Sequence, residues 1–167
     1  KEYMKERYDC QILVENNVIA DLKGQYLDLS GTNRNLVYLY ISDGVGGSII
    51  CNGQVIDGEN SMAGKFAHIL VESGGRLCAC GKRGHLESYV SKPAMEEAYF
   101  EASGKRLELP EICRLANAGE TAAAAVLTDA IDKLAIGINQ IFLVVNPGTL
   151  VLYGDLFECV DGIVEYL

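Results

Sequence analysis

Two histidines and two cysteines lie close together in one glycine-rich stretch of this sequence, and all four side chains are zinc ligands. They are His68, Cys78, Cys80 and His85, and the chain has no other histidine. Structural zinc sites take four such ligands in a tetrahedron, commonly two thiolates and two imidazoles. Because four protein ligands leave no open position on the metal, the spacing predicts a structural zinc ion and not a catalytic one.

The alternative is that these residues are ordinary loop thiols and surface histidines that bind no metal. A Cys-x-Cys pair seldom forms its own disulfide, because the bond would be strained. Glycines at positions 74, 75, 81 and 84 allow the tight turns that would bring the ligands together, so we favour the metal. The other four cysteines are scattered singly and form no disulfide framework, which predicts a reducing, cytoplasmic compartment.

A second glycine-rich segment, residues 43–48, has the sequence Asp-Gly-Val-Gly-Gly-Ser and lies between two predicted strands. We call it the glycine-rich turn. Backbone N–H groups in such a turn can cradle a phosphate, which makes Asp43, Gly44, Gly46 and Gly47 phosphate-loop candidates. The alternative is a tight β-turn without a ligand. Asp43 argues against a phosphate, because like charges repel.

A polar segment, Glu-Asn-Asn at residues 15–17, follows a short apolar run at residues 11–14. The ends of buried strands are common places for site residues in α/β folds. Asn16 and Asn17 can hydrogen-bond a sugar hydroxyl, but an amide cannot act as a general base. The alternative is that one of them caps a helix over residues 18–29.

The apolar pattern predicts the elements that must position these residues. Strands are predicted at residues 11–14, 36–41, 48–51, 54–56 and 149–153, with Asn52-Gly53 as a hairpin turn. Helices are predicted at residues 1–9, 18–29, 93–103, 110–118, from 120 up to Asn146, and at 157–167. Residues 57–91 are predicted to be mostly loop. Strands followed by helices predict a mixed α/β domain with helices packed against a sheet.

Length and charge narrow the classes of function. A chain of 167 residues can bury a core of its own. Its net charge of −9 disfavours direct nucleic-acid binding, because phosphate contacts need clustered Lys and Arg. No apolar run is long enough to span a bilayer, and the polar first residues form no signal peptide, so no membrane partner is expected.

Several motifs occur in a fixed order along the chain. The glycine-rich turn and the hairpin are followed by Ala-Gly-x-x-x-His at residues 63–68, by Cys-x-Cys-Gly-x-x-Gly-x-Leu-Glu at residues 78–87, and by Asn-Pro at residues 146–147. In this order they resemble the ROK family, which contains bacterial sugar kinases and sugar-responsive transcriptional repressors such as the xylose and N-acetylglucosamine repressors. The resemblance covers the chain from about residue 11 to residue 154.

The resemblance implies an α/β fold: one lobe of the actin-like, ribonuclease-H-like ATPase domain, present in part. Residues 1–30 would be the end of the first lobe and the hinge between the lobes. Residues 31–167 would be the second, zinc-containing lobe, incomplete at its C-terminal end. The remainder of the first lobe, with its Asp-x-Gly-Gly-Thr phosphate loop, and the helix-turn-helix segment of the repressors would lie outside this sequence.

The resemblance also assigns roles to single residues. The family's zinc ligands fall on His68, Cys78, Cys80 and His85. His85 departs from the family, which has Cys at this position, but imidazole can replace thiolate at zinc. The family's sugar contacts fall on Asn16, His68 and Glu87.

Three further positions depart from the family pattern. The catalytic Asp of the kinases, which accepts the proton of the sugar hydroxyl, falls on Asn17. A sugar-binding Glu falls on Lys65, and the Thr that opens the second phosphate loop falls on Asp43. Losing a general base, losing a phosphate donor and gaining a carboxylate all disfavour phosphoryl transfer.

These departures predict a protein without catalytic activity: the effector-binding domain of a ROK transcriptional regulator. A sugar or sugar derivative would bind near Asn16, Asn17, Lys65, His68 and Glu87. Zinc is the expected cofactor and ATP is not; the expected partners are the sugar, a second copy in a homodimer, and DNA through a segment outside this sequence. Two alternatives stay open. One is an active ATP-dependent sugar kinase resembling glucokinase or N-acetylhexosamine kinase, and the other is an interaction domain that has lost ligand binding.

Overall fold

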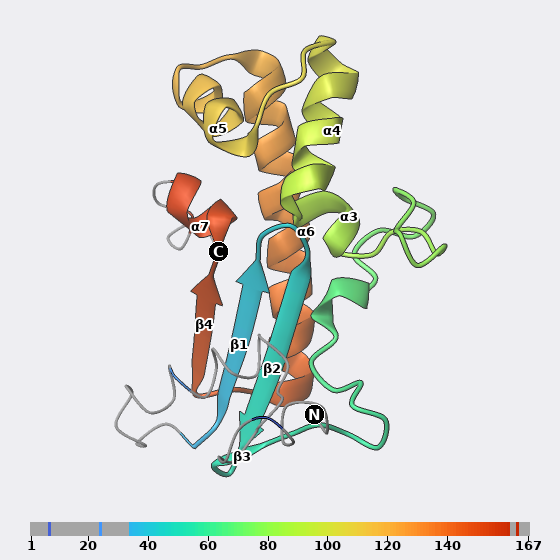
Figure 1. Cartoon of the computed structure of the whole chain (residues 1–167), viewed down its shortest axis with the longest axis vertical. Coiled ribbons are helices and arrows are strands. Elements are labelled where there is room, and N and C mark those ends of the chain that lie inside the picture. Colours follow the sequence, from blue (N-terminus) through green and yellow to red (C-terminus); the bar gives the residue numbers. More distant parts are fainter. Residues whose placement is uncertain (1–6, 8–23, 25–33, 161–162, 164–167) are drawn as a thin grey trace.

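The computed structural model describes residues 7, 24, 34–160 and 163. The elements predicted between residues 1 and 29 lie outside the described residues, except for the single positions 7 and 24. Asn16 and Asn17 are therefore not placed. The described part is an α/β domain in which helices pack on a four-stranded sheet, as predicted (Figure 1).

The sheet has the strand order β3-β2-β1-β4. Its strands are β1 (Leu36–Ile41), β2 (Val45–Cys51), β3 (Gln54–Val55) and β4 (Thr149–Tyr153). The first three form the predicted antiparallel meander, and β4 pairs parallel with β1. Asn52 and Gly53 both have positive φ angles, 53° and 80°, as a two-residue hairpin turn of this kind requires.

Six helices lie within residues 34–160. They are η1 (Phe66–His68), α3 (Glu87–Val90), α4 (Lys92–Ser103), α5 (Leu109–Asn117), α6 (Thr121–Val145) and α7 (Asp155–Cys159). The long helices have capping residues. Gly104 ends α4 in the left-handed conformation, and the Glu120 carboxylate accepts a hydrogen bond from Ala123 N at the start of α6.

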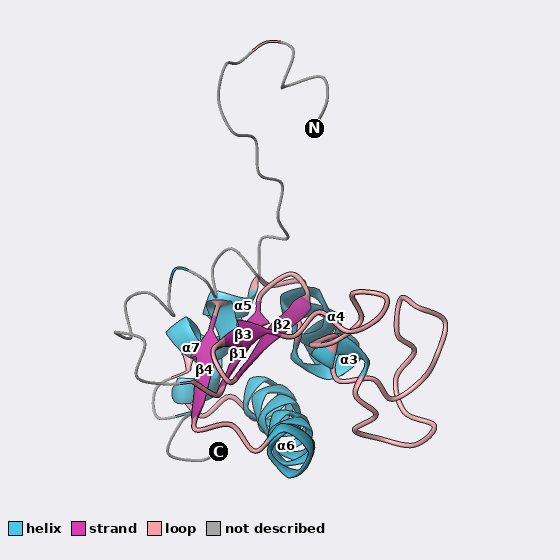
Figure 2. Cartoon of the chain, turned by 90° about the horizontal axis from the view of Figure 1, so that it is seen from below, coloured by secondary structure: helices cyan, strands magenta, loops and turns pink. Residues whose placement is uncertain are grey.

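The main core lies between one face of the sheet and α6. Val37, Leu39 and Ile41 alternate along β1 and point to this side, where they meet the apolar stripe of α6 around Leu134 and Ile138. Figure 1 shows α6 running behind the sheet, with its upper half beside α4 and α5, and Figure 2 shows α6 on one side of the strands. No helix in the described part of the chain combines the length and apolar composition that crossing a membrane requires.

Two predicted boundaries were wrong. Strand β2 begins at Val45 and not at Ser48, because Val45, Gly46 and Gly47 pair with the end of β1. Helix α7 begins at Asp155, two residues before the predicted start, and ends at Cys159; Ile163 is also helical, and the rest of the predicted helix after residue 160 lies outside the described residues. The loop predicted at residues 57–91 also contains two short helices, η1 and α3.

Candidate metal centre

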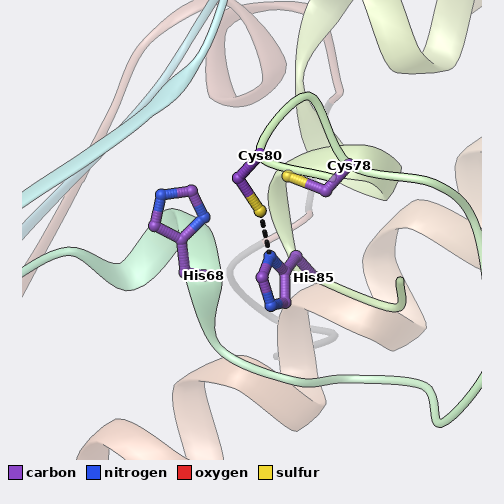
Figure 3. Close-up of side chains that lie close together, drawn as sticks. All are labelled: His68, Cys78, Cys80 and His85. Atoms are coloured by element: carbon purple, nitrogen blue, oxygen red, sulfur yellow. Dashed lines mark hydrogen bonds between the residues drawn. The ribbon is translucent and has the colours of Figure 1, made fainter. Parts of the chain in front are cut away.

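The four predicted zinc ligands converge in the structure. One ligand atom from each of His68, Cys78, Cys80 and His85 lies within 4.8 Å of every other, and Figure 3 shows the side chains pointing toward a common centre. Cys80 Sγ is 3.2 Å from His85 Nδ1, and the two imidazole rings are 5.2 Å apart between centroids. Residues that are up to 17 positions apart in sequence are thus brought to one point.

The loop that carries these ligands, residues 66–86, is called the metal-binding loop below. It doubles back on itself through two isolated antiparallel bridges, Leu70 with His85 and Leu77 with Arg83. The first bridge brings His85 to within two residues of His68. At the tip, the Gly81 N–H donates to the Cys78 carbonyl and the Cys78 N–H donates to the Lys82 carbonyl, so Cys78 and Cys80 share one tight turn.

Gly84 shows why this loop needs glycine. Its φ is +79°, and a Cβ at this position would lie 1.6 Å from the Glu72 carbonyl oxygen. Only glycine tolerates both the left-handed backbone and this close approach. The two arms of the metal-binding loop can therefore lie against each other directly before His85.

The ligands differ in burial. Cys78 and His85 are buried, with 3% and 8% of their surface exposed, whereas His68 and Cys80 are exposed. Burial lowers the pKa of His85 below its ordinary value, and the charge of His68 lowers it further. Both effects favour neutral imidazole, which is the form that binds a metal. Burial raises the pKa of the Cys78 thiol, so a nearby cation would be needed to hold it as thiolate.

Glu87 connects the metal-binding loop to the glycine-rich turn. Its Oε2 accepts a hydrogen bond of 3.1 Å from Val45 N, and a Cβ on Gly44 would lie 3.2 Å from the same oxygen. Glu87 itself follows His85 by two residues, at the start of α3. Two segments predicted as separate candidate sites therefore meet at one side chain.

The glycines of the turn serve packing. A Cβ on Gly47 would lie 2.1 Å from Phe66 Cδ2 and 2.9 Å from the Gly64 carbonyl oxygen. The first turn of η1 thus lies directly on β2, just before the ligand His68. Asp43 is exposed at the tip of the turn.

Lys65 is also exposed and immediately precedes η1, where its carbonyl accepts a hydrogen bond from His68 N. Of the other predicted sugar contacts, His68 lies in the ligand cluster and Glu87 is the first residue of α3, whereas Asn16 and Asn17 lie outside the described residues.

A family model agrees with this arrangement over nearly the whole chain. The model of the ROK family matches residues 1–166. The chain belongs to the ROK family. The family's fold is therefore the fold of this chain: a partial actin-like ATPase domain with a mixed sheet and packed helices.

Both functional classes of the ROK family are among the chain's relatives. The chain is 27% identical to the xylose repressor of Bacillus subtilis (strain 168), over 95% of this chain and 41% of the repressor. It is 30% identical to a glucokinase of Pyrobaculum calidifontis, over 90% of this chain and 51% of the glucokinase. These matches do not separate a regulator from a kinase.

The solved structures include a ROK hexokinase from Thermus thermophilus, similar with a TM-score of 0.90 and 27% identity. The similarity covers 98% of this chain and 57% of the hexokinase. The chain spans about half the length of the curated relatives that it matches.

Two contacts of this ROK chain were not predicted from the sequence. One is the hydrogen bond from Val45 N to Glu87, and the other is the contact of Tyr89 with the metal-binding loop. In each contact the two residues lie too far apart in sequence for helix or strand periodicity to predict that they meet. The glycines at positions 44 and 75 were the sequence features that marked these contacts. A Cβ on either residue would clash with or crowd the partner side chain.

Proposed function

We propose that this chain is the sugar-binding part of a ROK-family transcriptional regulator, with a structural zinc ion in place of any catalytic centre. The proposal depends mainly on one observation: the glycine-rich turn presents its Val45 N–H to the Glu87 carboxylate. A phosphate would need that N–H group as a donor. In this chain an internal carboxylate already occupies it.

Electrostatics at the turn act in the same direction. Asp43 adds a second carboxylate at the exposed tip, within the same short segment. Two negative charges beside a nucleotide phosphate repel it, and little in the solvent-exposed turn offsets this repulsion. The turn therefore favours a structural role over binding of ATP.

The residue that aligns with the kinase base supports the same conclusion. Asn17 stands at that position in the sequence, and its amide cannot take a proton from a sugar hydroxyl. General base catalysis contributes about 10²–10⁴-fold to such reactions. A chain that lacks this base and has carboxylates at the phosphate turn is suited to bind a sugar without phosphorylating it.

Zinc fits the four converging side chains. Zinc bonds of about 2.0–2.3 Å place tetrahedral ligands about 3.3–3.8 Å apart. The four ligand atoms here all lie within 4.8 Å of one another, so a modest contraction would complete the tetrahedron. The ion would hold the metal-binding loop in shape. It would thereby position His68 and Glu87, which we assign to the sugar together with Lys65, Asn16 and Asn17.

The proposal extends to the organisation of the protein. Residues 1–30 would join the two lobes, and residues 31–167 would belong to the zinc-containing lobe. DNA contact would come from another part of the protein, because a net charge of −9 on these residues repels phosphate. We expect a homodimer in the cytoplasm, in which sugar binding changes lobe closure and shifts the population that binds DNA.

A sugar kinase is the second candidate. The 30% identity to the Pyrobaculum calidifontis glucokinase and the close match to the Thermus thermophilus hexokinase favour it. This function requires a residue other than Asn17 to accept the hydroxyl proton, and it requires Glu87 to release Val45 N when ATP binds.

One pair of measurements separates the two functions. The intact protein is mixed with ATP, Mg²⁺ and a panel of hexoses, pentoses and N-acetylhexosamines, and ADP formation is followed by a coupled assay. The same sugars are titrated calorimetrically without nucleotide. We expect binding of at least one sugar and no sugar-dependent ADP formation. Turnover with any sugar would establish the kinase, and absence of all sugar binding would refute both functions.

A further inference from the structure

The hydroxyl of Tyr89 organises one arm of the metal-binding loop. Tyr89 lies in α3 and is 1% exposed. Its hydroxyl donates to Glu72 Oε2 at 2.5 Å and accepts a hydrogen bond of 2.8 Å from Arg76 N. Gly75 lies against the same oxygen, since a Cβ there would be 2.0 Å from it. Three of the five residues from 72 to 76 thus meet one buried oxygen atom.

This contact leads directly to the ligands. The Arg76 carbonyl accepts a hydrogen bond of 2.8 Å from Gly84 N, and Gly84 immediately precedes His85. Cys78 follows Arg76 by two residues. The hydroxyl of Tyr89 therefore holds the backbone of Arg76, and Arg76 in turn is two residues from Cys78 and bonded to the residue before His85.

One side of α6 holds the same arm of the loop from outside. Asp129, Lys133 and Gln140 are spaced by four and seven residues, which puts them on one stripe of the helix. Asp129 pairs with Arg76 at 2.9 Å, and Lys133 pairs with Glu72 at 3.4 Å. Gln140 Nε2 donates to the Leu70 carbonyl at 3.1 Å. The guanidinium of Arg76 and the ammonium of Lys133 also lie over the Tyr89 ring, at 4.8 and 5.4 Å from its centroid.

We infer that Tyr89 is a positioning residue for the metal centre: its hydroxyl preorganises the metal-binding loop so that Cys78 and His85 are already near their metal-bound positions. This inference rests on the proposed zinc site. Without the hydroxyl, the Arg76 N–H and the Glu72 carboxylate lose a shared buried partner, and the arm between His68 and Cys78 gains conformational freedom. Ordering that arm again on metal binding then lowers the metal affinity.

The electrostatics of the contact agree with a fixed loop. The Tyr89 hydroxyl lowers the pKa of Glu72, and Lys133 acts in the same direction. Burial raises the pKa of Tyr89, and the hydrogen bond to Glu72 raises it further. Both groups are therefore in the forms that the contact needs at neutral pH, with Tyr89 as donor and Glu72 as charged acceptor.

The first test removes only the hydroxyl. Tyr89→Phe in the intact protein should weaken Zn²⁺ binding by about 10–100-fold in competition with a chromogenic chelator, the usual range for groups that orient metal ligands. The charge-transfer and d–d bands of the Co²⁺-substituted protein should also lose intensity, because the tetrahedron is less uniform. Tyr99→Phe is the matched control. Tyr99 is equally buried, at 1% exposure, and lies in α4 and not in α3.

A second variant tests the same contact from the opposite side. Gly75→Ala places a Cβ on the Tyr89 hydroxyl and should weaken zinc binding to a similar extent. In the double variant Gly75→Ala/Tyr89→Phe the clash with the hydroxyl is removed. The double variant should therefore bind zinc no more weakly than the weaker single variant, which is a clear departure from additivity.

The outcomes separate this inference from the proposal that it rests on. If the unmodified protein binds no zinc, the metal centre itself is refuted. If it binds zinc and Tyr89→Phe changes neither the affinity nor the Co²⁺ spectrum, the zinc site stands and the role of Tyr89 is refuted. If the Tyr89→Phe protein fails to fold, Gly75→Ala alone decides, and an unchanged zinc affinity and Co²⁺ spectrum in that variant would overturn the inference.

Discussion

The metal-binding loop and the glycine-rich turn lie side by side, and both contain glycines beside residues that could do chemistry. In the loop, the glycines let four metal ligands converge. In the turn, Gly47 makes room for Phe66, and the Val45 N–H is bonded to Glu87. The same residue type thus supports a candidate ligand site in one segment and close packing in its neighbour.

A glycine-rich motif therefore has to be interpreted together with the residues that contact it in the fold. Backbone N–H groups bind an anion only if they are free of internal partners. Glu87 is such an internal partner, and it is the first residue of α3, directly after the metal-binding loop. In this chain the loop and the turn are therefore one connected structure, and changes in one should be felt in the other.

Loss of a buried ligand should give the largest effect. Cys78→Ser removes a thiolate from the proposed zinc site, so zinc content by mass spectrometry should fall from about one ion per chain to almost none. With free zinc at a thousand times its Kd, binding stabilises the folded state by about 4 kcal/mol. The melting temperature should fall by roughly 8–16 °C for a domain of this size.

Cys51→Ser is the control for this experiment, because Cys51 is an exposed thiol at the end of β2 and far from the cluster in sequence. It should keep both the zinc and the melting temperature. A Cys78→Ser protein with full zinc content would show that the converging side chains are ordinary loop residues.

Restoring an acid at position 17 should raise the rate of phosphoryl transfer less than the alignment with the kinases implies. Asn17→Asp returns the general base, which is worth about 10²–10⁴-fold in rate where the rest of the site is intact. We expect no sugar-dependent ADP formation from this variant, because Asp43 and Glu87 still occupy the phosphate turn. The double variant Asn17→Asp/Asp43→Thr should remain inactive in the same coupled assay, because Glu87 still accepts the Val45 N–H.

Asn16→Asp is the matched control, since it adds the same carboxylate one position away. Rapid turnover by Asn17→Asp alone would contradict the packing role of the glycine-rich turn. It would mean that the turn accepts a nucleotide despite the two carboxylates, Asp43 and Glu87.

The packing role of the turn predicts a loss of stability without loss of a ligand. Gly47→Ala places a Cβ 2.1 Å from Phe66 Cδ2, and overpacking of this kind costs about 1–3 kcal/mol. Urea unfolding should show this loss. Gly44→Ala, whose Cβ meets only the flexible Glu87 carboxylate at 3.2 Å, should cost less than about 0.5 kcal/mol. Equal effects of the two substitutions would contradict the packing role of Gly47.

The sequence predicts most elements of this fold because their signals are local. The apolar period of α6, its Glu120 cap and the Asn146 that ends it are all contained in one segment. The start of β2 is not a local property. Val45, Gly46 and Gly47 are poor strand residues taken as a group, and they are extended because β1 pairs with them.

The candidate site likewise has one part that local sequence features predict and another part that they do not. The convergence of the four candidate ligands could be predicted because their residue types are specific and their spacing is short. The contact of Glu87 with Val45 could not, because it requires the meeting of two segments 42 residues apart. For the same reason the buried hydroxyl of Tyr89 was not recognised as part of the metal-binding loop.

The smallest expected effect is in the chemical labelling of two cysteine thiols, one in the core and one in the metal-binding loop. Cys113 in α5 is 2% exposed, and burial together with the neighbouring Cys159 raises its pKa to about 12. Because the folded-state pKa is raised, the neutral thiol stabilises the fold below the unfolded pKa near 9, and this contribution is lost only as pH rises toward 12. Iodoacetamide at pH 8 should therefore leave Cys113 unmodified in the native protein.

Cys80, which is exposed, should become labelled only after a chelator has removed zinc. Peptide mapping measures both, and labelling of Cys80 in the untreated, zinc-loaded protein would contradict its assignment as a ligand.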